Sequence, residues 1–401
     1  MAVNKSTLYK NESQKNYDIT EAKREQYRKI SHESRLAKRA AEQGLFNPVH
    51  AINKPRFCPN TLMPQLAGNG LNTVSLFCGG GGLDLGFDRA GYMHRASYEL
   101  IPICGDTFRY NRPEWDVFVG PDHGDVTQVD WRTYQDEVDV VHGGPPCQPF
   151  SVAGQQKGHK DPRNMWDEFS RAINTIKPKA FVAENVLGIK SPKFADFVKR
   201  YIYDGLSNYH IQMFEMNSAD FGVPQIRRRI IFVGFKNKKF LDRFHIPVAT
   251  HSWSHLVGKS KLDSNAYTLE LFPNDEIKTM GVRAALGLEH IGCDSLAPTL
   301  RSGFTGKRNT TSILNSTAGQ KAWAALQIWP NGVQSTRQKA SAFPAKDDHF
   351  RLSVQDCGLL QGFPEEWRFA GAVYEVLGQI GNSVAPPVAY AVAKAVADAL
   401  R

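Results

Sequence analysis

Short apolar runs alternate with stretches of helix length between Leu71 and about residue 245. The runs are rich in Val, Ile and Phe, which favour buried strands, and the spacers between them are long enough for helices. Strands that alternate with helices predict a mostly parallel sheet and an α/β fold. The strands are expected at Val74–Phe77, Ala96–Leu100, Val138–His142, Ala180–Ala183, Ile211–Glu215 and Ile230–Phe235.

The rest of the chain has other patterns. Ile19–Gln43 is polar and compatible with a helix, with few apolar anchors. Residues 251–350 are rich in Ser, Thr, Gly, Asn and Lys without a regular period, which predicts an irregular second domain. Pro387–Leu400 has the pattern of an amphipathic or buried helix. We therefore divide the chain into residues 1–70, 71–250, 251–364 and 365–401.

Positive charge gathers in two of these regions. The formal net charge is +9, and residues 1–70 carry 12 Lys and Arg against 6 Asp and Glu. Residues 251–350 carry 11 against 8, so the remainder of the chain is balanced. This distribution suggests appendages that contact an anion. Ile19–Gln43 can therefore be a solvated helix, a DNA-contacting arm or part of a small helix-turn-helix.

Several protein classes are disfavoured by the composition. The six Cys residues are scattered, without a C-x-x-C pair, which argues against a disulfide scaffold and a zinc module. No apolar stretch approaches the roughly 18 residues of a membrane span. The first ten residues lack the apolar core of a signal peptide. We expect a reduced cytoplasmic protein with no membrane segment and no metal.

A glycine-rich turn follows the first expected strand, between Ser75 and Phe87. Glycines allow the backbone to turn tightly and to approach a ligand at the start of the next helix. Glu99, at the end of the second strand, could accept hydrogen bonds from ribose hydroxyls, and Asp125 could meet an adenine amino group. The turn alone leaves a structural role, NAD and other nucleotide cofactors open.

The run Gly143–Ser151 presents a cysteine in an unusual setting. Two prolines precede Cys147 and hold the backbone rigid, and a loop at a strand end exposes the thiol, as a nucleophile requires. An isolated Cys is otherwise most often a small buried apolar residue. Glu184, at another strand end, is a candidate acid, and the arginines of Gln225–Arg229 can hold a phosphate or a base carbonyl.

Together these runs resemble the DNA (cytosine-5)-methyltransferases, and they occur in the order of that family over residues 71–245 and 350–401. The resemblance implies an S-adenosylmethionine-dependent methyltransferase fold, which is Rossmann-like, with a target-recognition domain at 251–364. It also implies that residues 365–401 return to the catalytic domain. The matching motifs are Phe77–Gly82, Pro145–Gln148, Glu184–Val186, Gln225–Arg229, Leu360–Pro364 and Gln379–Val384.

The resemblance also implies the chemistry. Cys147 would add to carbon 6 of a flipped cytosine, and Glu184 would contact N3 and the amino group. Arg229 would hold O2, and Arg227 the backbone phosphate. S-adenosylmethionine would be the cofactor, and Met165 or Trp166 could touch it. Its other predicted contacts are Phe77, Gly79, Gly81, Leu83, Glu99, Asp125, Pro146, Asn382 and Ser383.

Double-stranded DNA is the expected partner, bound by a monomer associated with the nucleoid. A loop at Cys147–Asn164 would close over the base, with Gln155 or Gln156 filling the vacated stack. A cognate restriction endonuclease could act on the same site without stable binding. Residues 251–350 are called the variable region below. Base readers or phosphate contacts are expected in it, at Arg301, Thr305, Lys307, Arg308 and Arg337.

Other functions stay open at this point. A tRNA cytosine-5 methylase on the same fold would share nearly every motif. A Rossmann oxidoreductase would explain the glycine turn but would leave Pro-Pro-Cys-Gln without a role. A DNA-binding protein without activity would be expected to have lost Cys147 or Glu184, and both are present. Residues 1–70 also permit an added role as a transcriptional regulator.

Overall fold

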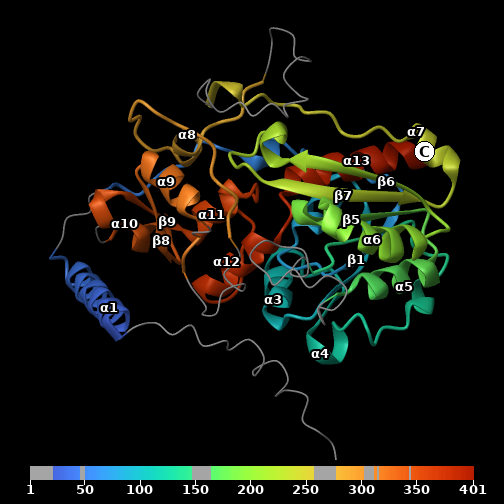
Figure 1. Cartoon of the computed structure of the whole chain (residues 1–401), viewed down its shortest axis with the longest axis horizontal. Coiled ribbons are helices and arrows are strands. Elements are labelled where there is room, and N and C mark those ends of the chain that lie inside the picture. Colours follow the sequence, from blue (N-terminus) through green and yellow to red (C-terminus); the bar gives the residue numbers. More distant parts are fainter. Residues whose placement is uncertain are drawn as a thin grey trace, which may run out of the picture.

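The protein has a large body built on one sheet and a smaller part beside it (Figure 1). No helix in the described part of the chain is long and apolar enough to cross a membrane. The computed structural model describes residues 21–45, 50–146, 164–256, 277–301, 311–313, 316–342 and 345–401.

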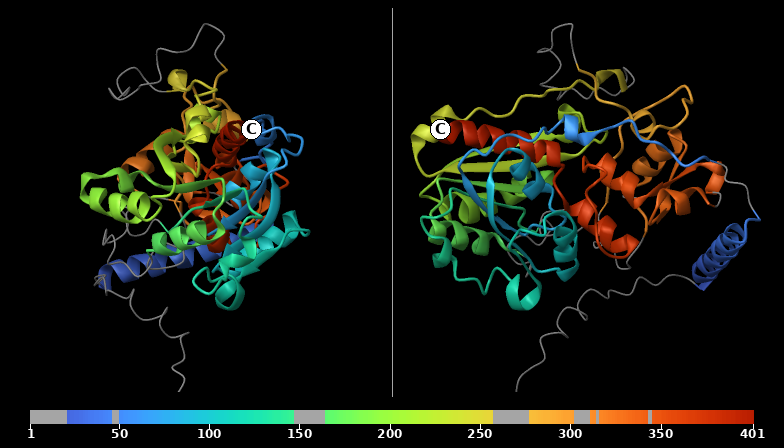
Figure 2. Two further views of the ribbon diagram at one scale, coloured as in Figure 1. Left: turned by 90° about the vertical axis from the view of Figure 1, so that its right-hand side faces the viewer. Right: turned by 180° about the vertical axis from the view of Figure 1, so that it is seen from behind.

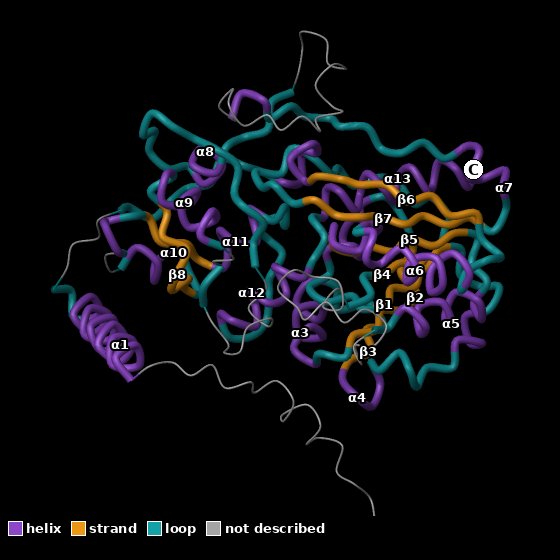
Figure 3. The backbone as a smooth tube through the Cα atoms, in the orientation of Figure 1, coloured by secondary structure: helices purple, strands orange, loops and turns teal. Residues whose placement is uncertain are grey.

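Seven strands form the main sheet, in the order β3-β2-β1-β4-β5-β7-β6. Strands β1 to β5 are parallel, and β7 runs antiparallel to both β5 and β6 (Figure 3). The predicted mostly parallel α/β sheet is confirmed. The strand bounds are β1 Asn72–Leu76, β2 Met93–Glu99, β3 Val117–Val119, β4 Val140–Gly143, β5 Ala180–Val186, β6 His210–Asn217 and β7 Arg228–Phe235.

The six expected strands are present, and β3 is an addition that the sequence did not indicate. It has three residues, too few for an apolar run, and it is recognisable only because it pairs with Ser97–Glu99 of β2. Strand β5 is apolar and buried almost throughout, because helices cover both faces of the sheet.

The two faces of the sheet have separate cores. One is built with α2 and α13, including Phe87 and Val388, and the other with α5, including Phe169 and Ile173. The helices of the body are α2 Gly82–Arg89, α3 Pro102–Asn111, α4 Gly120–His123, α5 Trp166–Ile176, α6 Ala195–Phe197, α7 Lys238–Arg243 and α13 Pro386–Leu400.

The smaller part is more ordered than its composition predicts. It contains a parallel strand pair and a core in which Trp323, Phe350 and Leu360 are buried. The alternation of apolar and polar residues expected of a strand is interrupted in β8 by the run Pro330-Asn331-Gly332, so the sequence pattern does not reveal this strand. Its elements are α8 Val282–Leu286, α9 Thr317–Ala325, β8 Ile328–Gln334, α10 Arg337–Ser341, β9 Phe350–Ser353, α11 Val354–Leu360 and α12 Val373–Asn382.

Both ends of the chain join these parts. The predicted N-terminal helix is α1, Glu21–Glu42. After it, residues 50–70 run along both parts (Figure 2): Phe57 N–H donates to Ala285 O at 3.2 Å, and Asn69 N–H to Gly91 O at 2.8 Å. At the other end, α12 contributes Val376 and Ile380 to the smaller core, and α13 packs on α2.

Candidate functional site

A cavity of about 370 Å³ lies where the strand order reverses, between β1 and β4. It opens at the carboxyl ends of the parallel strands, which is where ligands bind in open α/β sheets. Phe77 follows β1, Glu99 ends β2, Pro146 follows β4 and Glu184 belongs to β5, and all four line this cavity. The topology therefore brings together residues that are far apart in the sequence.

The glycine turn is shaped by two close contacts. Gly81 has a φ of 84°, and a Cβ there would come 2.7 Å from the ring of Trp367. At Gly82 a Cβ would come 2.2 Å from Val384 O. The Trp367 indole also donates to Gly80 O at 3.2 Å. Glycine is thus required here so that the C-terminal segment can press against the turn.

Eight of the nine predicted cofactor residues line the cavity, and Gly81 instead packs on Trp367. Of the two residues that follow the predicted loop, Met165 lines the cavity and Trp166 is buried in the core. The eight are Phe77, Gly79, Leu83, Glu99, Asp125, Pro146, Asn382 and Ser383.

The acidic residues of the cavity are held by backbone amides. Glu99 accepts hydrogen bonds from the N–H groups of Gly79 and Ile101, both at 2.9 Å. Burial raises the pKa of Glu99, and these amide donors oppose the rise. Asp125 accepts from the N–H and hydroxyl of Thr127 at 3.0 and 2.8 Å. Two carboxylates beside apolar walls fit a nucleoside that offers hydroxyl and amino donors.

Glu184 and Arg229 form an ion pair at the same cavity. Arg229 Nε lies 2.7 Å from Glu184 Oε1, and the side chains are 13% and 9% exposed. Burial raises the pKa of Glu184, and the charges of Arg229 and Arg227 oppose that rise. The pair therefore places a carboxyl group with a raised pKa next to a fixed cation, which suits general acid–base work.

Asn185 holds the segment that leads to Cys147, a role that its sequence pattern does not predict. It is fully buried in β5 next to Glu184, and its Nδ2 donates to Pro145 O at 3.1 Å. Its Oδ1 accepts from the N–H of Val186 at 2.9 Å. The rigid prolines before Cys147 are thus fixed to the strand that carries Glu184.

Arg227 has a different place from the predicted phosphate contact. Its side chain is 1% exposed, and it donates to Gly381 O at 2.8 Å and to Ser383 O at 2.7 Å. A guanidinium that is enclosed in this way cannot reach a DNA backbone, so the prediction is wrong. Arg227 instead fixes the C-terminal segment that lines the cavity.

Gln225 connects the buried hydrogen bonds around Arg227 to residues of the smaller part. Its side-chain amide donates to Leu360 O at 3.0 Å and to Gln361 Oε1 at 2.9 Å, and it accepts from Leu300 N–H at 3.1 Å. Gln361 in turn donates to Ser383 O at 2.7 Å. The segment that leads into the variable region is therefore linked to a cavity-lining residue through hydrogen bonds.

Arg337 is also not placed as the predicted base or phosphate contact. Its guanidinium lies 2.9 Å from the buried Asp356 and 2.5 Å from Glu365, and its side chain is 14% exposed. These pairs occupy the groups that would read a base, so Arg337 stabilises the smaller part. Arg301 is half-buried. Six predicted residues lie outside the described part of the chain: Cys147, Gln155, Gln156, Thr305, Lys307 and Arg308.

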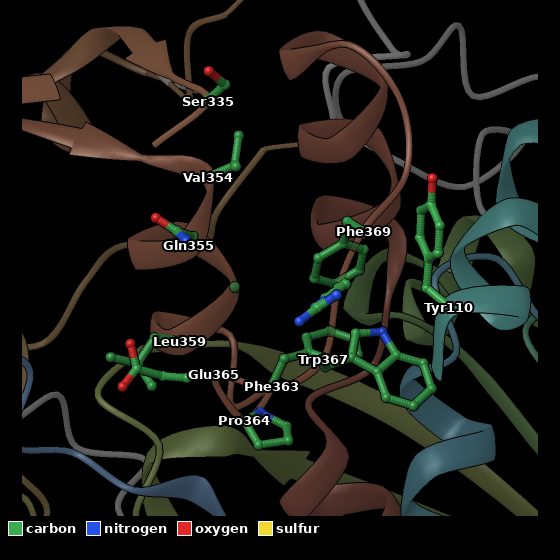
Figure 4. Close-up of a pocket in the computed structure, with 12 residues that line it drawn as sticks. Tyr110, Ser335, Val354, Gln355, Leu359, Phe363, Pro364, Glu365, Trp367 and Phe369 are labelled. Atoms are coloured by element: carbon green, nitrogen blue, oxygen red, sulfur yellow. The ribbon is translucent and has the colours of Figure 1, made fainter. Parts of the chain in front are cut away.

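A second cavity of about 490 Å³ lies between α11 and the end of α3. Figure 4 shows aromatic side chains, among them Trp367, Phe369 and Tyr110, facing Gln355 of α11 across it. Trp367 separates this cavity from the glycine turn. Within the described ranges, no group of three or more His, Cys, Asp or Glu could hold a metal ion.

Comparison with known proteins gives consistent matches. The sequence model of the family described as "C-5 cytosine-specific DNA methylase" matches residues 71–398. The Type II methyltransferase M.NgoMIV of Neisseria gonorrhoeae is 31% identical over 331 residues, covering 82% of this chain and 98% of that relative. The Type II methyltransferase M.NaeI of Lentzea aerocolonigenes is 31% identical over 339 residues, covering 82% and 75%.

Solved structures share the fold. A Spodoptera frugiperda DNMT2 mutant aligns with a TM-score of 0.50 at 17% identity, covering 81% of this chain and 99% of that one. The S. pombe Dnmt2 methyltransferase also aligns with a TM-score of 0.50, at 15% identity, covering 80% and 97%. At these identities the likeness concerns the fold alone.

Proposed function

This chain belongs to the C-5 cytosine-specific DNA methylases, which methylate carbon 5 of cytosine in DNA, and from this premise we propose a covalent mechanism centred on Cys147. Carbon 5 of cytosine is a poor nucleophile. The thiolate of Cys147 adds to carbon 6, forming an S–C bond and making carbon 5 enamine-like. After carbon 5 is methylated, it loses its proton, and the S–C bond breaks to restore the aromatic ring.

Glu184 and Arg229 support this addition in the proposal. Addition at carbon 6 puts electron density on the ring, which N3 and O2 can share if they meet a proton and a positive charge. Glu184 lies at N3 in this proposal, and burial raises the pKa of its carboxyl, which favours sharing a proton with N3. Arg229, paired with Glu184 at 2.7 Å, offers its remaining N–H groups to O2.

The family uses S-adenosylmethionine, and its sulfonium methyl group is the electrophile that carbon 5 requires. In our proposal Glu99 binds the ribose hydroxyls and Asp125 the adenine amino group. Phe77 packs on the ligand, and Ser383 and Asn382 close the cavity from the C-terminal segment. These residues fit because they line one cavity whose walls combine carboxylates with apolar residues.

Cytosine cannot be reached inside a duplex, so we propose that the base is flipped into this site. The loop Cys147–Asn164 would close over it, with Gln155 or Gln156 in the vacated stack. Residues 251–364 would form the target-recognition domain, with Arg301, Lys307 and Arg308 at the base pairs or phosphates. A monomer would suffice, because the catalytic and recognition parts belong to one chain.

We further propose that the protein protects DNA from a cognate restriction endonuclease. The relatives reported above carry the name Type II methyltransferase, which supports this role. The observation that carries the whole proposal is the cavity at the strand switch, where Glu184, Arg229 and the prolines before Cys147 meet.

Bisulfite sequencing of genomic DNA from cells that express the protein tests the proposal. Cytosines within one short sequence should be protected from conversion. Restriction endonucleases that cut this sequence can then be tested on the methylated DNA, which should resist cleavage. A Cys147→Ser variant in the same cells is the matched control and should leave no protected cytosine. Protected cytosines in tRNA with none in duplex DNA would contradict the proposal and favour an RNA substrate.

A further inference from the structure

Helix α1 carries a stripe of basic residues along one face. Arg24, Arg28, His32, Arg35 and Arg39 follow one another at intervals of three or four residues, and all five are exposed. Because an α-helix has 3.6 residues per turn, such intervals place the five side chains on one side. At 1.5 Å per residue the stripe is about 22 Å long.

The ion pairs of Arg24 and Arg28 with Glu21 are weak enough to exchange. Glu21 lies 3.5 Å from Arg24 and 3.8 Å from Arg28, and the side chains involved are 55–76% exposed. Ion pairs between exposed groups contribute only about 0–1 kcal/mol. A polyanion that offers several phosphates can therefore replace Glu21 as the partner of these arginines.

The stripe lies outside the part of the chain that resembles known methylases. The family match begins at residue 71, whereas α1 ends at Glu42. M.NgoMIV is covered over 98% of its length by 82% of this chain. The match to the methylase family therefore assigns no role to α1, and a role has to be inferred from the side chains of the helix itself.

The composition of α1 favours a nucleic-acid backbone over a membrane surface. Membrane-surface helices need a broad apolar face with residues such as Trp, Phe and Leu. Tyr27, Ile30 and Leu36 are the only large apolar residues among the 22 of α1, and Leu36 is exposed. The stripe instead offers about one cation per 5.4 Å turn, and each DNA strand offers one phosphate per roughly 3.4 Å of axis.

We propose that α1 binds the phosphate backbone of duplex DNA through Arg24, Arg28, Arg35 and Arg39, in addition to the base pairs held by the catalytic and recognition parts. The proposal rests on DNA being the substrate. Guanidinium–phosphate contacts carry no sequence information. The helix therefore strengthens binding to every duplex equally and lengthens the stretch of DNA that the protein covers.

The test compares two variants of the full chain that lose equal charge. In the first, Arg24, Arg28, Arg35 and Arg39 are changed to Gln, which preserves helix propensity. In the control, four exposed basic residues of and beside α7, at the far end of the body (Figure 1), are changed to Gln: Lys236, Lys238, Lys239 and Arg243. Fluorescence anisotropy gives the Kd on a random 40-base-pair duplex between roughly 50 and 300 mM salt.

The stripe variant should bind at least tenfold more weakly at the lowest salt. Its plot of log Kd against log salt should be shallower by about 3.6, which is about 0.9 for each of the four lost phosphate contacts. The control should differ from wild type by less than one in that slope. At saturating duplex both variants should methylate at the wild-type rate. Equal slopes for the two variants would overturn the proposal. The two variants are also compared for binding to phosphatidylglycerol vesicles. Weaker binding of the stripe variant to vesicles, with unchanged binding to duplex DNA, would likewise overturn the proposal. Absence of methylation by the wild type would instead contradict the proposed function, while the slopes still decide this inference.

Discussion

Asp84 is a buried carboxyl whose replacement should stabilise the protein. It lies in the first turn of α2 and is 2% exposed, and its Oδ1 accepts from the Ser97 hydroxyl at 2.8 Å. Burial raises its pKa from 3.8 to about 6, although the Ser97 hydrogen bond opposes the rise. Ionised Asp84 is therefore destabilising in the folded protein.

The pH dependence follows from the sign of that shift. Below pH 4 Asp84 is protonated in both the folded and the unfolded state, and its burial does not lower the free energy of unfolding through charge. Between pH 4 and 6 only the unfolded state has lost the proton, so the cost to stability grows, and above pH 6 it is constant. At about 1.4 kcal/mol per pKa unit, the shift from 3.8 to about 6 corresponds to about 3 kcal/mol.

Asp84→Asn keeps an acceptor for Ser97 and removes the charge. The variant should exceed wild type in free energy of unfolding by about 3 kcal/mol at pH 8, with the difference shrinking toward pH 4. Urea titrations at several pH values, followed by tryptophan fluorescence, measure this difference. Asp196→Asn, at an exposed carboxyl on α6, is the control and should show no such trend. A variant that is less stable than wild type at pH 8 would refute the reasoning.

Three further substitutions test other contacts. Gly82→Ala places a methyl group 2.2 Å from Val384 O, so urea titration should show a loss of about 1–3 kcal/mol, and calorimetry weaker cofactor binding. Arg337→Met leaves the buried Asp356 unpaired and should cost about 3–5 kcal/mol, while target choice in bisulfite sequencing stays the same. Asn185→Ala frees the prolines before Cys147, so the rate of methyl transfer should fall even at saturating cofactor, as single-turnover assays can measure.

Much of the sheet and of the cavity could be predicted from the sequence, because both depend on local patterns. Apolar runs mark buried strands, and Glu99 and Glu184 stand at or near strand ends that a parallel sheet gathers at one edge. The glycine turn was visible for the same reason. What it packs against was not, because Trp367 is separated from Gly81 by most of the chain.

The errors come from residues whose role depends on distant partners. An Arg in the pattern Gln-x-Arg-x-Arg can hold a phosphate or backbone carbonyls, and only the fold shows that Arg227 meets the carbonyls of Gly381 and Ser383. The sequence predicts Arg337 as a base or phosphate contact, because its ion pair with Asp356 depends on the fold. Asn185 was passed over because its partner, Pro145 O, lies on another strand's loop.

The covalent role of Cys147 is the central claim, and a trapped adduct tests it most directly. Duplex DNA in which 5-fluorocytosine replaces every cytosine needs no knowledge of the target, and fluorine at carbon 5 prevents the proton loss that releases the thiol. With S-adenosylmethionine present, mass spectrometry should detect the wild-type protein joined to DNA through Cys147, whereas Cys147→Ser should bind the duplex without an adduct. A wild-type protein that methylates ordinary DNA but forms no adduct with this duplex would contradict the account.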